Sequence, residues 1–331
     1  MLILNANEPN ELAHYLLKKN WLHPDETILS LTKPGEGNMN YVLRVTTNLR
    51  TFIIKQSRAY VEKYPQVAAP IERVITEAAF YQKISKKSSI QSRMPRLLGL
   101  DKVNYILILE DLGKSNDYSI LYDLKHRLTT EEVTVLVSYL NELHTHFQKT
   151  IIDDELANLE LRKLNYEHIF RYPFLEDNGF DLDSIQIGLR ELALPYKKEA
   201  VLKTKVELLG SLYMSKGKYL LHGDYFPGSW LKTDDGIKII DPEFCCFGSR
   251  EFDLGVFIAH FYLSQQDLNL IATIEKEYTA FADLNSEILN GFVGVEMMRR
   301  LIGLAQLPLQ MDLKNKGKLL ELANQLIMKL R

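Results

Sequence analysis

The sequence predicts an α+β chain of two parts: a smaller N-terminal part with an antiparallel sheet, and a larger part that is mainly helical. Three observations lead to this prediction. Short β-prone runs and Gly-containing turns occupy much of the first third of the chain. Helical periodicity dominates from residue 118 onward. A length of 331 residues allows two domains, which we place at residues 1–112 and 113–331.

Composition excludes several classes of protein. The chain is 46% hydrophobic and 25% charged, with a net charge of -3, as in ordinary globular proteins. It has no strongly basic character to indicate a nucleic-acid partner, no run of 18 apolar residues to indicate a membrane span, and no signal-peptide pattern. The two adjacent cysteines, Cys245 and Cys246, cannot form a long-range disulfide, which favours a cytoplasmic location. A homodimer is compatible with this composition.

The N-terminal part is expected to begin with an amphipathic helix. This helix covers residues 8–20, with Pro9 near its start. Strands are expected after it, at residues 27–32, 41–45 and 50–56. Between the first two strands, the glycines of Gly35-Glu36-Gly37-Asn38 can place backbone N–H groups over phosphates. Any tight hairpin also uses glycine, so this turn alone is not specific.

A lysine and a glutamate after this turn suit a nucleotide. Lys55 follows an apolar strand, and Glu77 lies in a predicted helix at 72–81, from which it can reach back to Lys55. The alternative for Lys55 alone is an edge lysine that extends to water. The next strand, 103–109, leads into Glu110-Asp111-Leu112-Gly113, whose backbone we expect to meet adenine.

The helical part contains one clear helix start and one region without a clear pattern. Thr129 and Glu132 form a capping-box signature. Residues 150–195 are polar with scattered aromatics and favour no element. Pro195 is then expected to open a long helix that ends at about Lys216.

Polar residues within apolar helices have structural explanations as well as functional ones. His144 and His146 point to different sides of one helix and lack a third ligand, so packing or solvent accounts for them better than a metal site does. Asp253 begins an apolar helix at 252–264. If buried, its carboxylate must be hydrogen-bonded, and at an exposed N-terminus it would be favoured by the helix dipole.

The stretch at residues 219–244 carries the strongest chemical signal. Two β-prone runs joined by Asp234-Asp235-Gly236 predict a hairpin. Because a hairpin brings its open ends together, Asp224 before it should lie beside Asp241 and Glu243 after it. Converging carboxylates repel each other unless a cation lies among them. Phosphoryl transfer from Mg-ATP uses such a set: one carboxylate takes the proton of the acceptor hydroxyl, and others hold Mg²⁺.

This stretch resembles the aminoglycoside phosphotransferase and choline kinase superfamily, and within it the methylthioribose kinase family most closely. The resemblance rests on His222-Gly223-Asp224, Ser229 and Asp241-Pro242-Glu243-Phe244, and it continues through Phe252-Asp253-Leu254-Gly255. The Gly-containing loop is also similar to that of methylthioribose kinases, whereas Glu110-Asp111-Leu112-Gly113 resembles the wider superfamily. The resemblance implies a two-lobed, protein-kinase-like fold.

The residues and the resemblance together give the expected site. Asp224 is the expected catalytic base, Asp241, Glu243 and Ser229 the Mg²⁺ ligands, and His222 and Asp253 the support of the catalytic loop. The expected ATP-binding residues are Gly35, Gly37, Asn38, Lys55, Glu77, Glu110 and Leu112. Arg299 and Arg300 match an arginine pair that faces the sugar in methylthioribose kinases. The alternative is a surface i,i+4 pair between Glu296 and Arg300, with Arg299 in solvent.

We therefore expect an ATP- and Mg²⁺-dependent kinase of a small hydroxylated molecule, methylthioribose or a related sugar. The segment between Glu243 and Phe252 is too short for a protein-kinase activation segment, which argues against a protein substrate. Aminoglycosides, choline-like alcohols and other small alcohols are alternative acceptors. A nucleotide-binding pseudokinase is the non-catalytic alternative, and ATP turnover distinguishes it from an enzyme.

Overall fold

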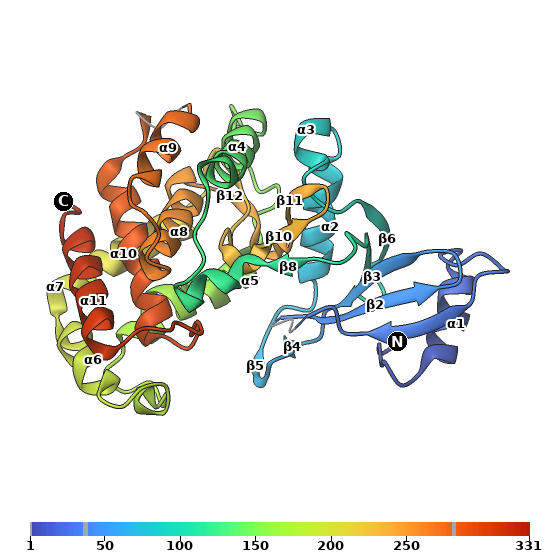
Figure 1. Ribbon diagram of the computed structural model, residues 1–331, viewed down its shortest axis with the longest axis horizontal. Coiled ribbons are helices and arrows are strands. Elements are labelled where there is room, and N and C mark those ends of the chain that lie inside the picture. The colour runs from blue at the N-terminus through green and yellow to red at the C-terminus, as the bar shows by residue number, and fades with distance from the viewer. Residues whose placement is uncertain (1, 36–38, 280–282) are drawn as a thin grey trace. The chain divides into compact units, whose positions relative to one another are not determined.

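The computed structural model describes residues 2–35, 39–279 and 283–331 (Figure 1). The chain divides into two compact units. Unit 1 comprises Met1–Asn116 and Thr233–Phe244, and unit 2 comprises Asp117–Lys232 and Cys245–Arg331. The segment that carries Asp241 and Glu243 therefore belongs to the same unit as the N-terminal strands. Among the described residues, no helix combines the length and apolar composition that a membrane span requires.

Unit 1 is built on an antiparallel sheet with strand order β1-β2-β3-β7-β6. Its elements are α1 (Pro9–Lys18), β1 (Ile28–Thr32), β2 (Tyr41–Thr47), β3 (Thr51–Gln56), β4 (Tyr60–Val61), β5 (Tyr64–Ala68), α2 (Arg73–Ile84), α3 (Ser88–Gln91), β6 (Leu97–Asp101), β7 (Ile106–Glu110), β11 (Gly236–Ile239) and the 3₁₀ turn η6 (Pro242–Phe244). The predicted first helix and the first three predicted strands are confirmed. The strands β4, β5 and β6 were not predicted.

The alternation of side chains along β3 separates the core of unit 1 from its polar site. Phe52 and Ile54 are buried in a cluster with Leu12 and Leu16 of α1. Successive side chains in a strand point to opposite faces, so Lys55 points away from this cluster. It stands between Val42 of β2 and Leu107 of β7 in the register of the sheet. The central strand thus holds the lysine on a rigid element, on the face that does not contact α1.

Unit 2 is mainly helical. Its elements are the 3₁₀ helix η1 (Tyr118–Asp123), α4 (Thr130–His146), α5 (Leu159–Tyr166), the π-helical η2 (Glu167–Arg171), the 3₁₀ turns η3 (Tyr172–Phe174) and η4 (Leu182–Ser184), α6 (Leu189–Lys198), α7 (Ala200–Met214), β9 (Tyr219–Leu221), the 3₁₀ turn η5 (Pro227–Ser229), β12 (Cys246–Gly248), α8 (Arg250–Leu263), α9 (Leu270–Glu277), α10 (Ser286–Ile302) and α11 (Leu313–Met328). The remaining strands are β8 (Asn116–Asp117) and β10 (Trp230–Thr233).

The core of unit 2 is formed by α10, which packs against both α8 and α11, as Figure 1 shows in its orange and red helices. The helices α8 and α10 approach closely at Gly255, where an added Cβ would lie 2.6 Å from the Cβ of Phe292. Two short strands, β9 and β12, pair with each other, and β9 leads directly into His222. The predicted capping box is present, because Thr129 accepts from the Glu132 amide and Glu132 accepts from the Thr129 amide.

One helix prediction was wrong. Pro195 does not open a helix but lies inside α6, and the long helix expected up to Lys216 is two helices that meet at Glu199. Glu199 has an extended backbone, with φ -71° and ψ 107°, and its carboxylate accepts the Val201 amide at 3.1 Å. This side-chain cap begins a new helix there. The hairpin of β10 and β11 is confirmed.

Candidate active site

In unit 1, Lys55 is held between two carboxylates. Its Nζ donates to Oε1 of Glu77 at 3.0 Å and also to Oδ1 of Asp241. The Lys55 side chain is 9% exposed and that of Glu77 is fully buried. Burial acts to lower the pKa of the Lys55 ammonium, but Asp241 and Glu77 outweigh it and hold this pKa above its usual value. The predicted Lys55–Glu77 pair is present, and Asp241 is a second partner that was not predicted.

Asp241 has an unusual backbone conformation, with φ at +62°. Few residues other than glycine adopt this region, although Asp and Asn tolerate it best. Its side chain is 44% exposed, in contrast to the buried Lys55 and Glu77. A carboxylate held in a strained conformation, with an oxygen still open to solvent, is typical of functional sites.

Glu243 is buried in a polar network that the sequence did not indicate. It accepts from Nδ2 of Asn40 at 2.9 Å, and Nε of Arg73 lies 3.7 Å from its Oε2. Arg73 is itself buried, and it donates to Oδ1 of Asn40 and to the carbonyl of Met39. The arginine thereby ties the residues that follow the Gly-containing turn to Glu243.

The charges of this group favour a bound cation. Burial and the neighbouring carboxylates of Glu77 and Asp241 raise the pKa of Glu243 to about 8, although Arg73 and Lys55 oppose the rise. Three carboxyl groups thus share two cationic side chains, and a bound cation would offset the cost of ionising all three. The described residues contain no set of three or more His, Cys, Asp or Glu side chains that could hold a metal. Mg²⁺ at a nucleotide needs only one or two carboxylates besides phosphate oxygens, and Asp241 and Glu243 fit that requirement.

The segment after β7 is fastened by an arginine from β2. Nε and Nη2 of Arg44 donate to the two carboxylate oxygens of Asp111 at 2.9 and 3.0 Å, and Nη2 also donates to the Gly113 carbonyl at 2.9 Å. The carboxylate of Glu110 instead pairs with Arg96. Any contact of Glu110 with adenine would therefore use its backbone. The hydrogen bonds of Arg44 therefore fix Asp111 and Gly113, the residues on either side of Leu112.

The Gly-containing loop is described only in part. Gly37 and Asn38, both expected to bind ATP, lie outside the described residues. An added Cβ on Gly35 would meet no atom within 4 Å, so packing of the described residues does not require glycine there.

In unit 2, Asp253 holds the backbone just before Asp224. Its two carboxylate oxygens accept the amides of His222 at 2.7 Å and Gly223 at 2.9 Å, and all three residues are buried. His144 supports Asp253: Nε2 lies 3.2 Å from Asp253 Oδ2 and Nδ1 lies 2.8 Å from the Tyr278 hydroxyl. His144 is thus a satisfied buried residue. Gly223 has φ at +86°, so glycine is the residue that this turn favours.

Asp224 lies beside the two adjacent arginines. Its Oδ1 is 3.6 Å from Nη2 of Arg300 and 4.0 Å from Nη1 of Arg299. Burial raises the pKa of Asp224, and the two guanidinium groups act against that rise. A raised pKa makes a carboxylate a better proton acceptor. The guanidinium of Arg300 also lies over the ring of Phe226, 4.6 Å from its centroid.

Glu296 organises both arginines from one turn away on α10. It accepts from Nη1 of Arg299 at 3.1 Å and from Nε of Arg300 at 2.6 Å. Glu296, Arg299 and Arg300 are only 2%, 8% and 5% exposed. The alternative of a surface pair with Arg299 in solvent is therefore wrong. Burial opposes ionisation of Glu296, but the two guanidiniums hold its pKa well below the usual value.

A histidine completes this buried network. Nε2 of His260 lies 3.2 Å from Oε1 of Glu296, and Nδ1 lies 2.8 Å from the Tyr122 hydroxyl. Burial lowers the pKa of His260 to about 4, so the ring is neutral at neutral pH. Because ionised Glu296 can only accept, Nε2 carries the proton and Nδ1 accepts from Tyr122.

Ser229 is buried next to the backbone of Asp224. Its hydroxyl donates to the backbone carbonyl of Asp224 at 2.9 Å. This bond fixes the position of Asp224 and leaves the oxygen lone pairs of Ser229 available. Ser229 and Asp224 belong to unit 2, whereas Asp241 and Glu243 belong to unit 1, so convergence of these residues on one Mg²⁺ stays a prediction.

A phosphotransferase family model, described as "Phosphotransferase enzyme family", matches residues 30–286. The chain belongs to this family. The match includes the strand that carries Lys55, the segment that carries Asp224, and Asp241-Pro242-Glu243. It confirms the prediction of a small-molecule kinase with an alcohol group as acceptor.

Methylthioribose kinases are similar to this phosphotransferase over most of its length. A methylthioribose kinase of Bacillus cereus (strain AH187) is 25% identical over 85% of this chain and 81% of its own length. A methylthioribose kinase of Geobacillus sp. (strain WCH70) is 26% identical over 86% of this chain and 80% of its own. The predicted likeness to methylthioribose kinases is therefore confirmed.

Solved structures establish the fold of this phosphotransferase. A choline kinase from Streptococcus pneumoniae covers 96% of this chain and 99% of its own, with a TM-score of 0.54 at 13% identity. A spectinomycin phosphotransferase, in complex with ADP and spectinomycin, covers 96% of this chain and 97% of its own, with a TM-score of 0.52 at 14% identity. The predicted kinase-like α+β fold is confirmed.

Proposed function

We propose that this enzyme phosphorylates a hydroxyl of a neutral sugar, methylthioribose or a close relative, with ATP and Mg²⁺. The observation that carries this proposal is the pair Arg299 and Arg300 beside Asp224, held by Glu296. The similarity to methylthioribose kinases over most of the chain supports the same acceptor.

The charge balance around Asp224 favours a neutral acceptor. Two carboxylates, of Asp224 and Glu296, face two guanidiniums, of Arg299 and Arg300, and His260 is neutral. A cationic choline-like or aminoglycoside acceptor would bring a further positive charge towards two arginines, and like charges in a buried site repel. A neutral polyol instead offers oxygen atoms that guanidinium N–H groups can bond.

The arginines retain donors for such oxygens. Nε of Arg299 and Nη2 of Arg300 are buried and have no hydrogen-bond partner among the described residues. Buried donors in native proteins are normally bonded to protein or water. Nη2 of Arg300 is also the atom nearest Asp224, at 3.6 Å. An acceptor hydroxyl that binds between Asp224 and Arg300 would satisfy both groups.

The chain's residues then have distinct tasks in the reaction. Asp224 orients the acceptor hydroxyl and takes its proton, while Asp253 and Ser229 keep its loop in place. Lys55, fixed by Glu77, contacts the nucleotide phosphates, and Asp241 and Glu243 hold Mg²⁺. When bound, Mg-ATP supplies the phosphoryl group and the positive charge that stabilises its transfer.

Acceptor-dependent release of ADP tests this proposal. Purified enzyme would be given Mg-ATP with methylthioribose, other neutral sugars, choline and an aminoglycoside at equal concentration. We expect the highest kcat/KM for a neutral sugar, and loss of turnover when EDTA removes Mg²⁺. Preference for choline or the aminoglycoside would contradict the charge argument. Nucleotide binding without turnover of any acceptor would instead support the pseudokinase alternative.

A further inference from the structure

Arg73, the first residue of α2, joins several segments of unit 1. Its side chain is fully buried. Nε donates to Oδ1 of Asn40 at 2.8 Å, and Nη2 donates to the carbonyl of Met39 at 2.6 Å. The remaining bonds go to backbone carbonyls near the ends of the β4–β5 hairpin, those of Arg58, Tyr60 and Pro70. Nε is thus bonded once and each Nη twice, which uses every N–H group of the guanidinium.

Asn40 connects Arg73 to Glu243. Its amide oxygen accepts from Nε of Arg73, and its Nδ2 donates to Oε2 of Glu243 at 2.9 Å. A guanidinium can only donate, so the amide oxygen has to face Arg73 and the NH₂ group has to face Glu243. Nε of Arg73 also lies 3.7 Å from the same Oε2. Two buried side chains therefore hold one oxygen of Glu243 and give its carboxyl group a fixed orientation.

The helix that carries Arg73 also reaches Asp241. Glu77 lies four residues after Arg73, so the two side chains share one face of α2. Glu77 accepts from Lys55, and Lys55 also donates to Asp241. The same helix face thus supports both carboxylates that we expect to hold Mg²⁺. Side chains that bond the ligands of a metal orient those ligands, and they affect metal affinity without touching the metal.

We propose that Arg73 is a positioning residue for Mg²⁺: through Asn40 it orients the carboxylate of Glu243, so that the metal strengthens nucleotide binding. This inference rests on the proposed function, in which Glu243 is a Mg²⁺ ligand. The N–H groups of Arg73 are all used within the protein, so it acts through Asn40 and Glu243. Met39 and Asn40, which Arg73 holds, also lead from the Gly-containing turn into β2.

A purely structural role for Arg73 gives a different result. If the arginine only held backbone carbonyls, its replacement would weaken nucleotide binding equally with and without Mg²⁺, or would leave it unchanged. Arg73→Lys keeps the positive charge near Glu243, but one ammonium group cannot reproduce the bonds of the guanidinium. Loss of a partner that orients a metal ligand typically lowers metal affinity about 10- to 100-fold.

The expected effect concerns the response of ADP affinity to Mg²⁺. In wild type, Mg²⁺ should increase the affinity for ADP. In Arg73→Lys this increase should be about 10- to 100-fold smaller, while the affinity for ADP in EDTA stays within about twofold of wild type. Asn40→Ala, which removes the connecting amide, should change the response in the same direction.

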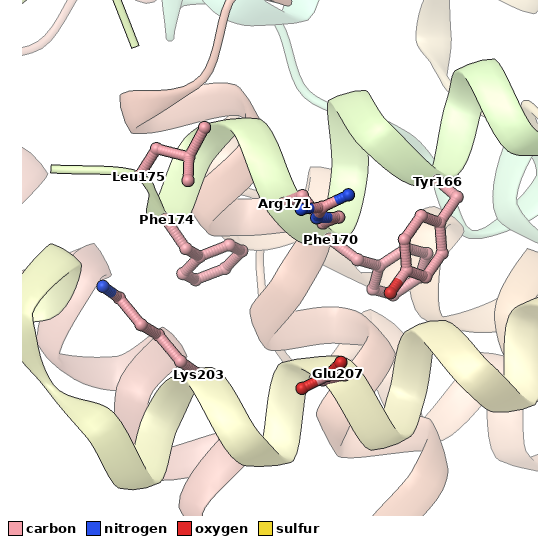
Figure 2. A pocket seen from close by; sticks show the side chains of 7 residues that line it. All are labelled: Tyr166, Phe170, Arg171, Phe174, Leu175, Lys203 and Glu207. Atoms are coloured by element: carbon pink, nitrogen blue, oxygen red, sulfur yellow. The ribbon is translucent and has the colours of Figure 1, made fainter. Parts of the chain in front are cut away.

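Two arginines of unit 2 provide controls. Arg162 is 2% exposed, and its Nη2 donates to the backbone carbonyls of Tyr213 and Ser215. Arg162→Lys therefore reports the loss of a buried arginine away from the expected metal ligands. Arg171 lies along an open pocket whose other wall is α7, as Figure 2 shows, and its side chain is 59% exposed. Arg171→Lys reports the same exchange at an exposed position. Both controls should keep the wild-type response to Mg²⁺.

Titration calorimetry of ADP, with saturating Mg²⁺ or with EDTA, measures this response without turnover. Urea unfolding of the free proteins shows whether each variant is folded, and Asn40→Ala carries the test if Arg73→Lys is not. An undiminished response to Mg²⁺, equal losses of ADP affinity with and without the metal, or the same reduction in Arg162→Lys would overturn the role of Arg73. A wild type that binds Mg-ADP but phosphorylates no acceptor would contradict the proposed function alone, because the calorimetric comparison still decides the role of Arg73.

Discussion

Replacement of Glu296 by glutamine tests how the arginine pair is held. Glu296 is 2% exposed and bonds Nη1 of Arg299, Nε of Arg300 and Nε2 of His260. Glutamine keeps the shape and one acceptor oxygen, but it leaves two buried guanidiniums with only the Asp224 carboxylate beside them. Removing one partner of a buried ion pair costs about 3–5 kcal/mol. We expect the lower end, about 3 kcal/mol in the free energy of unfolding.

The same substitution should change catalysis in a defined direction. The negative charge of Glu296 raises the pKa of Asp224, and the arginines lower it. Without Glu296 the pKa of Asp224 falls, so the carboxylate becomes a weaker base. The acid limb of the kcat–pH profile should therefore move to lower pH, and kcat on the plateau should decrease. The acceptor KM should rise because the guanidiniums lose their fixed orientation.

Glu287→Gln provides the control on the same helix. Glu287 pairs with Arg331, whose side chain is 92% exposed, and surface pairs contribute about 0–1 kcal/mol. Urea unfolding and steady-state kinetics of both variants give the comparison. If Glu296→Gln unfolded within about 0.5 kcal/mol of Glu287→Gln and kept the wild-type acceptor KM and pH profile, Glu296 would not hold the arginine pair.

Three further predictions concern groups that would contact nucleotide or acceptor. Asp224→Asn should bind ATP normally and lose at least about 10²-fold in kcat; a wild-type rate would remove Asp224 as the base. Asparagine tolerates the positive φ of residue 241, so Asp241→Asn should keep the backbone. Loss of a charged ligand should lower Mg²⁺-dependent nucleotide affinity at least about tenfold. Unchanged affinity by calorimetry would exclude Asp241 from the metal site. Arg299→Ala and Arg300→Ala should each raise the acceptor KM by about 10- to 150-fold, which corresponds to about 1.5–3 kcal/mol per charged hydrogen bond. The KM for ATP should stay nearly unchanged. Acceptor KM values within twofold of wild type would show that the arginines do not bind the acceptor.

Local patterns predicted the elements that carry the site. The hairpin followed from Asp234-Asp235-Gly236, and the helix of Glu77 and the strand of Lys55 followed from their periodicity. The second partner of Lys55 could not be predicted in this way. Asp241 is 186 residues away from Lys55 along the chain, and no local pattern encodes such a contact.

The sequence did not show which charged side chains are buried. The spacing of Glu296 and Arg300 indicated an i,i+4 pair, but the same spacing is common on exposed helices. Only the packing of α10 between α8 and α11 makes this pair internal and gives it His260 as a further partner. The role of Arg73 was not predicted for the same reason, because a charged residue at a helix start is ordinarily exposed to solvent.

No helix or strand was predicted for residues 150–195 because their apolar positions follow no single helical period. The chain passes from α5 through the π-helical η2 to the 3₁₀ turn η3 within 16 residues, Leu159 to Phe174. These helices have i→i+4, i→i+5 and i→i+3 hydrogen bonds, so apolar positions drift between the patterns of each type.

We expect this phosphotransferase to act on a neutral sugar at Asp224, Arg299 and Arg300. The most direct measurement is kcat/KM for methylthioribose against choline and an aminoglycoside, by coupled ADP release with saturating Mg-ATP, in wild type and Asp224→Asn. We predict that wild type prefers the neutral sugar and that Asp224→Asn loses this turnover. Wild-type preference for a cationic acceptor would contradict a neutral-sugar substrate. Sugar turnover that survives in Asp224→Asn would contradict the role of Asp224 as the base.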